Sequence, residues 1–520
     1  MEERKIATTH DLQPGHMQEI AIDENHRVLL ANIDGEFHVT GCCCPHYGAP
    51  LAEGVLTGDT VTCPWHHARF DLKTGDLTEP PALDGLPHYE VRIEGGDVLV
   101  MLPEKLRSRR TPDMAAPDPS KDHRTFVILG AGAAGNAAAQ TLREDGFQGR
   151  IVMITVEQHL PYDRPNLSKA YLQGKASAEW MPLRSEKFYA TAGIEVLRRQ
   201  RVTNIDLRNK LLTFEDGGQL RYDLVLLTTG SAPRRLTIPG SDLTNVFTLR
   251  SYDDADAIIA ACERASRVAV IGAGFIGMET AASLSQRNLN VTVIAPESAP
   301  FERILGKGLG TLVQTVHEKH GISFKLGRTP ERFEGTGVVN AVLLDNGERI
   351  QADMIVVGIG ATPTLPSLQG LTLLPDGSVQ VDLSFRVMDS VYAAGDIATF
   401  PDVRTGQHIR IEHWRTAEQQ GRVAAHNMAG KYAIYDSIPF FWTKQGDVNI
   451  KYVGYAPEWD EVIIQGDMIA QDCLMFYVQH NRVLAVAGIN RGPQLAAIQE
   501  LMRRKAMPAA EELRQADTDW

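Results

Sequence analysis

The pattern of hydrophobic and polar positions divides the chain into two regions. In the N-terminal region short segments alternate between apolar and polar residues, which is typical of half-buried strands. The expected strands are Glu19–Ile22, Val28–Ile33, Phe37–Thr40, Val61–Thr62, Tyr89–Ile93 and Val98–Met101, with turns at Asp34-Gly35 and Gly95-Gly96. Further along, apolar strands run directly into glycine-rich turns and helices. The pattern therefore predicts a small all-β unit followed by an α/β region.

Two glycine-rich turns organise the α/β region. The apolar strand Phe126–Leu129 precedes the first turn and the helix Ala137–Leu142 follows it, while Val268–Ile271 precedes the second turn. The turn glycines are Gly130, Gly132 and Gly135 in the first, and Gly272, Gly274 and Gly277 in the second. This spacing lets backbone approach a pyrophosphate at a helix N-terminus. One such motif is weak evidence, whereas two predict one unit for FAD and an inserted unit for NAD(P)H.

Two loops of the N-terminal region each carry one cysteine and one histidine. They read Cys44-Pro-His46 and Cys63-Pro-Trp-His66. Two thiolates suit one iron of a Rieske [2Fe–2S] centre and two imidazoles suit the other. A structural zinc site is the alternative, but zinc fingers place the cysteine pair before the histidine pair. The segment resembles the Rieske family, and this resemblance implies Cys44, His46, Cys63 and His66 as metal ligands.

Neighbouring positions refine this interpretation. Ala49 and Trp65 stand where high-potential respiratory Rieske proteins have a disulfide pair, so the centre resembles the low-potential, ferredoxin-like type. We expect His67 to be an ordinary surface histidine, with a titratable neighbour of the cluster as the alternative. We expect Cys42 and Cys43 to be packing residues, with a redox-labile thiol as the alternative.

The segment after the first turn points to a flavin. Glu157 follows the next strand and is placed to accept hydrogen bonds from ribose hydroxyls. Residues 160–169, LPYDRPNLSK, resemble the flavin-facing segment of NADH-dependent ferredoxin reductases and apoptosis-inducing-factor-like proteins. That resemblance implies that Arg164 holds the FAD pyrophosphate and that Lys169 lies near flavin N5. No cysteine stands between Cys63 and Cys262, which excludes a dithiol relay and single-cysteine peroxidase chemistry.

The same families imply further cofactor contacts. Residues 228–230, TTG, resemble the crossing from the flavin unit to the nicotinamide unit, and Asp396 ends an apolar strand where it can accept from a ribityl hydroxyl. Trp442 is expected near the flavin, where its ring excludes water or carries electrons outward. The remaining FAD positions implied are Val202, Arg250, Glu412 and His413.

The sequence of the nicotinamide unit gives weaker evidence on whether the protein uses NADH or NADPH. Ala295 stands where an acidic residue is expected, and Glu297 follows two positions later. We assign Glu297 to the adenosine ribose and predict NADH, with NADPH as the alternative because Arg303 is close in sequence. Gly358, in the strand segment Met354–Gly360, is expected beside the nicotinamide. Glu279 is expected to pair with Lys169, and these two residues are the predicted catalytic pair.

The pattern becomes β-rich again after Tyr435 and resembles the C-terminal domain of ferredoxin-reductase-type flavoproteins. It predicts a hairpin over Met475–Gly488 and a helix over Pro493–Arg504. Residues 511–520 are expected to form a mobile tail. The Gln and Arg side chains of the predicted helix Ala417–Met428 are expected on the surface.

The composition of the chain limits its possible partners and its location. A net charge of −13 argues against nucleic acid as a partner. The chain has no apolar run long enough to span a membrane, and the segment MEERKIATTH is not a signal peptide. Six cysteines, three of them at positions 42–44, favour a metal in a reducing compartment over a disulfide scaffold. We therefore expect a cytoplasmic protein.

Together these features predict a multidomain chain. The expected domains are 1–105 (all-β Rieske), 106–123 (linker), 124–247 with 376–430 (FAD-binding, Rossmann-like), 248–375 (NAD(P)H-binding) and 431–520 (α+β C-terminal domain). The order resembles Rieske-fused apoptosis-inducing-factor-like oxidoreductases. That resemblance implies electron flow from NADH through FAD and the cluster to an external partner, such as an oxygenase, ferredoxin or cytochrome.

Two other functions remain compatible with the sequence. One is a redox-sensing signalling protein of the apoptosis-inducing-factor type, and the other is a reductase of a small quinone-like oxidant at the flavin. A Rieske oxygenase is excluded, because no domain with a two-histidine, one-carboxylate iron site follows the cluster motif. The terminal acceptor and the oligomeric state stay open.

Overall fold

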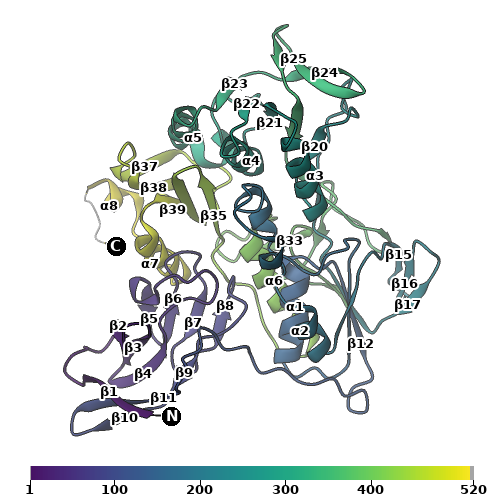
Figure 1. Ribbon diagram of the computed structural model, residues 1–520. Helices are drawn as coiled ribbons and strands as arrows, with labels where there is room; N and C mark the ends of the chain where they lie inside the picture. The colour runs from purple at the N-terminus through teal and green to yellow at the C-terminus, as the bar shows by residue number, and fades with distance from the viewer. Residues whose placement is uncertain (1, 516–519) are drawn as a thin grey trace.

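The computed structural model describes residues 2–515 and 520. Figure 1 shows the N-terminal β unit (purple) next to the C-terminal domain (yellow), with the first nucleotide-binding unit beside them and the second above it. No helix in the described part of the chain combines the length and apolar character needed to cross a membrane. The predicted fold class, an all-β unit followed by two Rossmann-like units and an α+β domain, is confirmed.

The N-terminal unit consists of three small antiparallel sheets. In spatial order they are β1 (Glu2–Thr8), β11 (Asp97–Leu102) and β10 (Val91–Glu94); β2 (His16–Ala21), β3 (Arg27–Ile33), β4 (Glu36–Gly41) and β9 (His88–Tyr89); and β5 (Val55–Thr57), β6 (Thr60–Thr62), β7 (Arg69–Asp71) and β8 (Leu77–Glu79). The single predicted strand Tyr89–Ile93 is wrong, because Tyr89 pairs with β4 whereas Val91 pairs with β11. The predicted metal loops connect β4 to β5 and β6 to β7.

The first nucleotide-binding unit contains a six-stranded sheet. Its order is β14 (Ile194–Leu197), β13 (Arg150–Ile154), β12 (Thr125–Leu129), β18 (Leu224–Leu227), β32 (Val391–Ala393) and β31 (Arg386–Met388), with all but β31 parallel. Helix α1 (Ala133–Glu144) begins four residues before the predicted start at Ala137, directly after the Gly-rich turn. Figure 1 shows α1 beside α6 (Trp414–Met428). Smaller elements of the unit are η2 (Arg164–Ser168), η3 (Ala178–Trp180), α2 (Glu186–Thr191), β15 (Val202–Asp206), β16 (Leu211–Phe214), β17 (Gln219–Arg221), β29 (Ser367–Gln369), β30 (Val379–Gln380), β33 (Ala398–Pro401) and β34 (His408–Ile409).

The second nucleotide-binding unit is inserted into the first. Its parallel sheet has the order β20 (Val246–Thr248), β27 (Met354–Val357), β21 (Arg267–Ile271), β22 (Asn290–Ala295) and β23 (Ser323–Leu326). Helices α3 (Tyr252–Cys262), α4 (Phe275–Ser285) and α5 (Glu302–Lys319) pack against it, and β24 (Pro330–Thr336), β25 (Val338–Leu344) and β26 (Arg349–Gln351) form a side sheet. The chain enters and leaves through the antiparallel pair β19 (Ser231–Pro233) and β28 (Ala361–Pro363).

The C-terminal domain is a five-stranded antiparallel sheet with two helices. Its order is β35 (Phe440–Gln445), β36 (Val448–Gly454), β39 (Arg482–Ile489), β38 (Asp472–Gln479) and β37 (Glu461–Asp467), followed by α7 (Gly492–Arg503) and α8 (Ala510–Gln515). The prediction of a mobile tail over 511–520 is wrong for the residues described. Leu513 is buried, and Trp520 stacks on Phe476 with ring centroids 5.3 Å apart. Residues 516–519 lie outside the described residues.

One buried carboxylate joins three domains. Glu79, at the end of β8, accepts hydrogen bonds from Arg415 and Gln419 on α6, both at 2.7 Å, and pairs with Arg503 on α7 at 2.6 Å. Arg415 also donates to the carbonyl oxygens of Pro80 and His67. The prediction that the Gln side chains of α6 lie on the surface is therefore wrong for Gln419, because the β unit covers it. It is also wrong for Gln420, which is fully buried and accepts from the backbone N–H of Gly395.

His67 is also a correction. It is fully buried, stacks on Phe440 with ring centroids 3.9 Å apart, and its Nδ1 lies 2.6 Å from Oε1 of Gln499. The residue adopts φ = 58°, so the loop turns its side chain toward the C-terminal domain rather than toward solvent. The prediction of a surface histidine treated the β unit as if it stood alone.

The Glu79 cluster makes interdomain stability pH-dependent. Burial alone would raise the pKa of Glu79, but the charges of Arg415, Arg503 and Arg69 lower it from 4.5 to about 2. This shift corresponds to about 3 kcal/mol of stabilisation, present above pH 4.5 and lost as the pH falls from 4.5 toward 2. We expect Glu79→Gln to remove this component and to destabilise the protein at pH 7, since Arg415 is left buried beside a neutral partner. Chemical denaturation across the pH range measures it.

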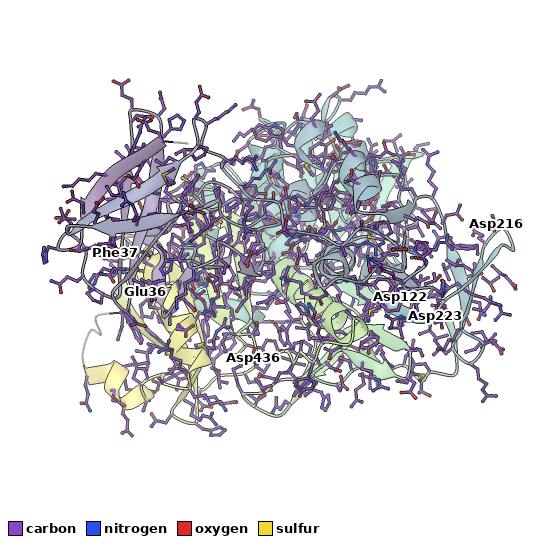
Figure 2. All side chains as sticks on the ribbon, turned by 90° about the horizontal axis from the view of Figure 1, so that it is seen from below. Glu36, Phe37, Asp122, Asp216, Asp223 and Asp436 are labelled. Atoms are coloured by element: carbon purple, nitrogen blue, oxygen red, sulfur yellow. The ribbon has the colours of Figure 1, made fainter. Side chains whose placement is uncertain are left out.

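The matched control is Glu36→Gln, which changes the same charge on the same unit. Glu36, labelled in Figure 2, has a side chain that is 77% exposed. Its substitution should leave the acid dependence unchanged. Equal acid profiles for Glu79→Gln and the unsubstituted protein would show that the cluster does not hold the domains together.

Candidate functional site

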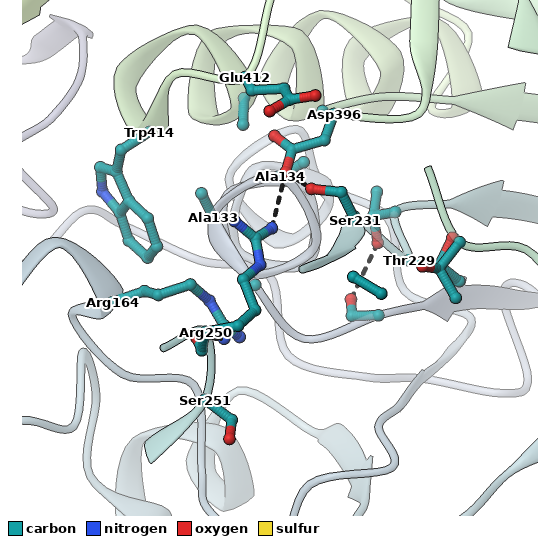
Figure 3. A pocket seen from close by; sticks show the side chains of 18 of the residues that line it. Ala133, Ala134, Arg164, Thr229, Ser231, Arg250, Ser251, Asp396, Glu412 and Trp414 are labelled. Atoms are coloured by element: carbon teal, nitrogen blue, oxygen red, sulfur yellow. Dashed lines mark hydrogen bonds and ion pairs between the residues drawn. The ribbon is translucent and has the colours of Figure 1, made fainter. Parts of the chain in front are cut away.

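A cavity of about 620 Å³ opens along the C-terminal edge of the first nucleotide-binding sheet. Figure 3 shows side chains from several elements that converge on it. The cavity brings together most of the predicted FAD residues: Gly130, Gly132, Glu157, Arg164, Lys169, Val202, Arg250, Asp396, Glu412, His413 and Trp442, together with Glu279. Gly135 does not line it.

The glycines of the first turn have three different physical roles. Gly130 has φ = 116°, and a Cβ there would lie 2.1 Å from the carbonyl oxygen of Thr228. A Cβ on Gly135 would lie 2.0 Å from the carbonyl oxygen of Gly130, so this residue lets the helix pack on the turn. A Cβ on Gly132 would meet nothing within 4 Å, which leaves room for a ligand beside the helix end.

Unsatisfied polar groups at the cavity fit a bound cofactor. Helix α1 starts at Ala133, and its N-cap residue Gly132 offers no side-chain cap, so the first N–H groups of the helix are available to a phosphate. Within the described part of the chain, buried His413 Nδ1 and Thr229 Oγ1 have no hydrogen-bond partner, and both residues line the cavity. Burial lowers the pKa of His413 to about 4, so its ring is neutral near pH 7. These groups are donors and acceptors without partners, as an FAD site requires.

Asp396 forms the polar centre of the cavity. Its Oδ2 accepts hydrogen bonds from Ser231 Oγ at 2.7 Å and from Arg250 at 2.6 Å, as Figure 3 shows. Burial would raise the pKa of Asp396, but the charge of Arg250 and these two hydrogen bonds hold it below its ordinary value. The carboxylate is therefore ionised and able to accept from a cofactor hydroxyl.

Glu157 and Arg164 form a second polar group at the cavity. Arg164 donates to Glu157 Oε1 at 2.7 Å and to the carbonyl oxygen of Arg250. The Tyr162 hydroxyl donates to Glu157 Oε2 at 2.6 Å. Both side chains predicted to hold the adenosine and pyrophosphate parts of FAD are thus held in place before a ligand arrives.

The Lys169–Glu279 pair links the two nucleotide-binding units. Lys169 Nζ lies 2.7 Å from Glu279 Oε2, and the Glu279 side chain is 4% exposed. Ser168 donates to the same oxygen at 2.5 Å, and Thr443 donates to Oε1 at 2.6 Å. Glu279 therefore receives donors from η2 and from β35, so three domains fix one carboxylate at the mouth of the cavity.

The four predicted metal ligands meet as a pair of sulfurs and a pair of imidazoles. His46 Nδ1 and His66 Nδ1 lie 3.1 Å apart, and the sulfurs of Cys44 and Cys63 are close enough for each to shift the pKa of the other. Backbone N–H groups within each loop point at its own sulfur. Within residues 2–515 and 520, no group of three or more His, Cys, Asp or Glu side chains is arranged to hold one metal ion.

The donor set fits a two-iron cluster. Burial lowers the pKa of His46 to about 4 and holds that of His66 well below its ordinary value, so both rings are neutral, the form that ligates metal. The contact between the sulfurs raises the pKa of Cys44 and lowers that of Cys63 to about 7, so one thiol ionises before the other. Two soft sulfurs beside two imidazoles match the ligand pattern of a Rieske centre.

Trp442 lies between the two sites. Its ring centroid is 4.4 Å from that of His66 and 6.3 Å from that of His46, while Trp442 also lines the FAD cavity. A second connection is the Tyr47 hydroxyl, which donates to the carboxylate of Asp163 just before Arg164. The metal loops are thus docked directly against the cavity.

The second glycine turn repeats the geometry of the first. Gly272 has φ = 108°, and a Cβ there would lie 2.4 Å from the carbonyl oxygen of Gly358. A Cβ on Gly277 would lie 2.2 Å from the Gly272 carbonyl oxygen, while a Cβ on Gly274 meets nothing within 4 Å. Gly358 therefore packs against the turn. Glu297 follows β22 and pairs with Arg303 at 3.4 Å.

Comparison with known proteins agrees with this geometry. Residues 124–421 match the pyridine nucleotide-disulphide oxidoreductase family, residues 2–90 match the Rieske [2Fe-2S] domain, and residues 440–520 match the reductase C-terminal domain. The chain belongs to the pyridine nucleotide-disulphide oxidoreductase family and is a nicotinamide-dependent FAD oxidoreductase with an N-terminal Rieske domain.

Individual relatives fall into two groups. The chain is 39% identical to apoptosis-inducing factor 3 of Homo sapiens, over 96% of this chain and 84% of that protein. It is 34% identical to the ferredoxin–NAD(+) reductase component of 3-phenylpropionate/cinnamic acid dioxygenase from Photorhabdus laumondii, over 74% of this chain and 97% of that protein. Among solved structures, putidaredoxin reductase in its covalent complex with putidaredoxin matches with a TM-score of 0.72 and 31% identity, over 75% of this chain and 95% of that chain.

Sequence reasoning missed several residues that complete the site. Ser168 and Thr443 hold Glu279, Tyr162 holds Glu157, and Ser231 holds Asp396. Tyr162 and Ser168 lie inside the motif at residues 160–169, and Ser231 directly follows the TTG motif, so a hydroxyl in or next to a motif was an available signal. Thr443 had none, because its partner is remote in sequence.

The Lys169–Glu279 pair leads to a kinetic prediction. We expect Glu279→Gln to slow reduction of bound FAD by NADH by about tenfold or more, because the charge that fixes Lys169 is lost. Anaerobic stopped-flow absorbance measures this rate. The control is Glu331→Gln, because Glu331 is exposed and lies in the second nucleotide-binding unit, as Glu279 does. This substitution should leave the rate unchanged. An unaltered rate in Glu279→Gln would remove the pair from the reaction.

Proposed function

We propose that this protein takes reducing equivalents from NADH and passes them one electron at a time through its Rieske domain to an external redox partner. Bound FAD would accept a hydride and release single electrons, and a [2Fe–2S] cluster would carry one electron at a time. The protein supplies the positions of these groups and the environment around them.

The contact of Trp442 with both sites carries this proposal. An indole ring that lines the FAD cavity and lies 4.4 Å from the ring of a predicted cluster ligand leaves little space for water between the two sites. A Rieske domain that acted independently of the flavin would not need its ligand loops docked here. The buried Glu79 cluster and buried His67 hold the domain in this position.

Each polar group of the site has a separate task. The N-terminus of α1 and Arg164 would bind the pyrophosphate, and Asp396 would accept from a hydroxyl of the FAD chain. Lys169, oriented by Glu279, would position the nicotinamide end of the reaction. No general acid–base group or nucleophile is required, because hydride and electron transfer break no bond in the protein.

The relatives support an external acceptor. Several ferredoxin–NAD(+) reductase components of dioxygenase systems resemble this chain, and one similar solved structure is a reductase joined to its ferredoxin. In this chain a Rieske domain is fused to the reductase part. We therefore infer that the fused domain delivers electrons to a later acceptor.

An anaerobic NADH titration tests the proposal. We expect loss of flavin absorbance, followed by the EPR signal of a reduced Rieske cluster. In Trp442→Leu we expect the EPR signal to develop at least about tenfold more slowly, with flavin bleaching little changed. Freeze-quench EPR and stopped-flow absorbance measure the two rates.

The control for this experiment is Trp520→Leu, the same exchange in the same domain, where the ring stacks on Phe476 away from both sites. It should leave both rates unchanged. A cluster that stays oxidised while flavin is fully reduced in the unsubstituted protein would contradict the proposal.

We also propose NADH as the preferred donor. Glu297 follows β22, its side chain is 24% exposed, and a carboxylate there accepts from ribose hydroxyls and repels a 2′-phosphate. Arg303 is engaged with Glu297, although its side chain is 81% exposed. We expect a larger kcat/KM for NADH than for NADPH.

Substitution tests this preference directly. Glu297→Gln should reduce the NADH/NADPH ratio of kcat/KM by about tenfold, since hydrogen bonds to a charged group are lost. Glu318→Gln, on the exposed side of α5, should leave the ratio unchanged. A larger kcat/KM for NADPH in the unsubstituted protein would overturn the assignment.

A further inference from the structure

A second cavity, of about 750 Å³, shares Lys169 and Trp442 with the FAD cavity. Four parts of the chain line it: the metal loops, the segment that contains η2 and η3, the helices α4 and α5, and the start of the C-terminal domain. None of the functions described above uses this cavity. Its lining is also distinct from the glycine turn at Gly272–Gly277, because it involves the C-terminal half of α4.

The alternation of β35 sends neighbouring side chains in opposite directions. Thr443 points to Glu279, whereas Trp442 and Lys444, two residues apart on the strand, share the opposite face and line the second cavity. His66 lines it as well. A molecule bound here would therefore lie beside a predicted cluster ligand and beside the indole that contacts it.

The charges that line the second cavity do not cancel. Lys169 is paired with Glu279, and His320 is paired with Asp447 at 2.8 Å. Lys175 bonds the neutral amide oxygen of Gln286 at 2.7 Å. In the described chain neither Lys175 nor Lys444 forms an ion pair with a carboxylate. Lys175 and Lys444 therefore outnumber Asp447, the lining carboxylate beside His320, and this excess of positive charge in a protein with net charge −13 favours a negatively charged ligand.

The aromatic lining indicates the shape of the ligand. Trp180 is 75% exposed and Tyr47 is 51% exposed, and both line the cavity together with Trp442. Large exposed aromatic rings at the edge of a cavity are typical of surfaces that bind a planar molecule. Lysine ammonium groups beside them would pair with a carboxylate or sulfonate on that molecule.

We propose that this cavity is a binding site for a small planar organic anion, held by Lys175 and Lys444 and stacked against Trp180. The site is separate from those for FAD and the nicotinamide, and its existence does not depend on the proposed electron path.

Calorimetry on the FAD-loaded, oxidised protein tests this directly, with NAD⁺ at saturation and no reductant. The probe is naphthalene-2-sulfonate, and naphthalene-2-sulfonamide is its neutral counterpart. We expect the sulfonate to bind with a stoichiometry of one and the sulfonamide to bind at least about tenfold more weakly. Because no electrons move, this result is independent of whether NADH reduces the cluster.

Substitutions locate the bound probe. The double variant Lys175→Gln with Lys444→Gln should weaken sulfonate binding by about tenfold or more, and Trp180→Leu should weaken it too. All three side chains are exposed or half-buried, so folding should be preserved. The matched control, Lys105→Gln with Lys505→Gln, removes the same charge at exposed positions elsewhere and should leave affinity unchanged.

Four results would overturn the proposal. One is absence of binding at millimolar probe. Another is equal binding of the sulfonate and the sulfonamide. The third is sulfonate binding that appears only without NAD⁺, because the probe would then occupy the nucleotide site. The fourth is sulfonate binding that the Lys175/Lys444 double variant retains, because the probe would then bind the general surface.

Discussion

The structure depends on a buried carboxylate that compensates arginines from two other domains. Glu79 of the Rieske domain lies between Arg415 of the FAD-binding unit and Arg503 of the C-terminal domain, and all three side chains are largely removed from water. Removing one partner would leave an uncompensated buried charge, which is costly, so the three domains are held in one arrangement. The stacking of His67 on Phe440 and the bond from Lys451 to the carbonyl oxygen of Pro64 act at the same interface. This arrangement places the metal loops against Trp442.

Trp442 and Thr443 show how one strand serves both redox sites. Neighbouring residues of β35 point to opposite faces, so Thr443 reaches Glu279 while Trp442 reaches His66. The C-terminal domain therefore fixes the residue expected to orient Lys169 and also fills the space between the cavity and the metal loops. A shift of this strand would disturb both sites together. The C-terminal domain therefore contributes to both sites by holding β35 in place.

The family relationship and the geometry describe a nicotinamide-dependent FAD oxidoreductase with a Rieske domain docked against it. Putidaredoxin reductase in its covalent complex with putidaredoxin matches 75% of this chain. In a fused protein, the Rieske domain stays at high effective concentration beside the reductase part without a bimolecular encounter. The buried Glu79 cluster goes further, because it holds the domain in place instead of leaving it on a free linker.

The sequence by itself was enough to predict the fold class and both glycine turns, and to select two pairs of side chains that the fold brings together, namely the cysteine–histidine pairs of the metal loops and Lys169 with Glu279. These depend on local backbone requirements, such as positive φ at Gly130 and Gly272, or on motifs with fixed spacing. It did not predict that His67 and Gln419 are buried, that Trp520 packs on Phe476, or that Ser168 and Thr443 hold Glu279. Each of these follows from the docking of domains that are remote in sequence. Periodicity reports which face of an element is apolar, whereas the burial of polar side chains at a domain interface is decided by partners that only the tertiary structure brings into contact.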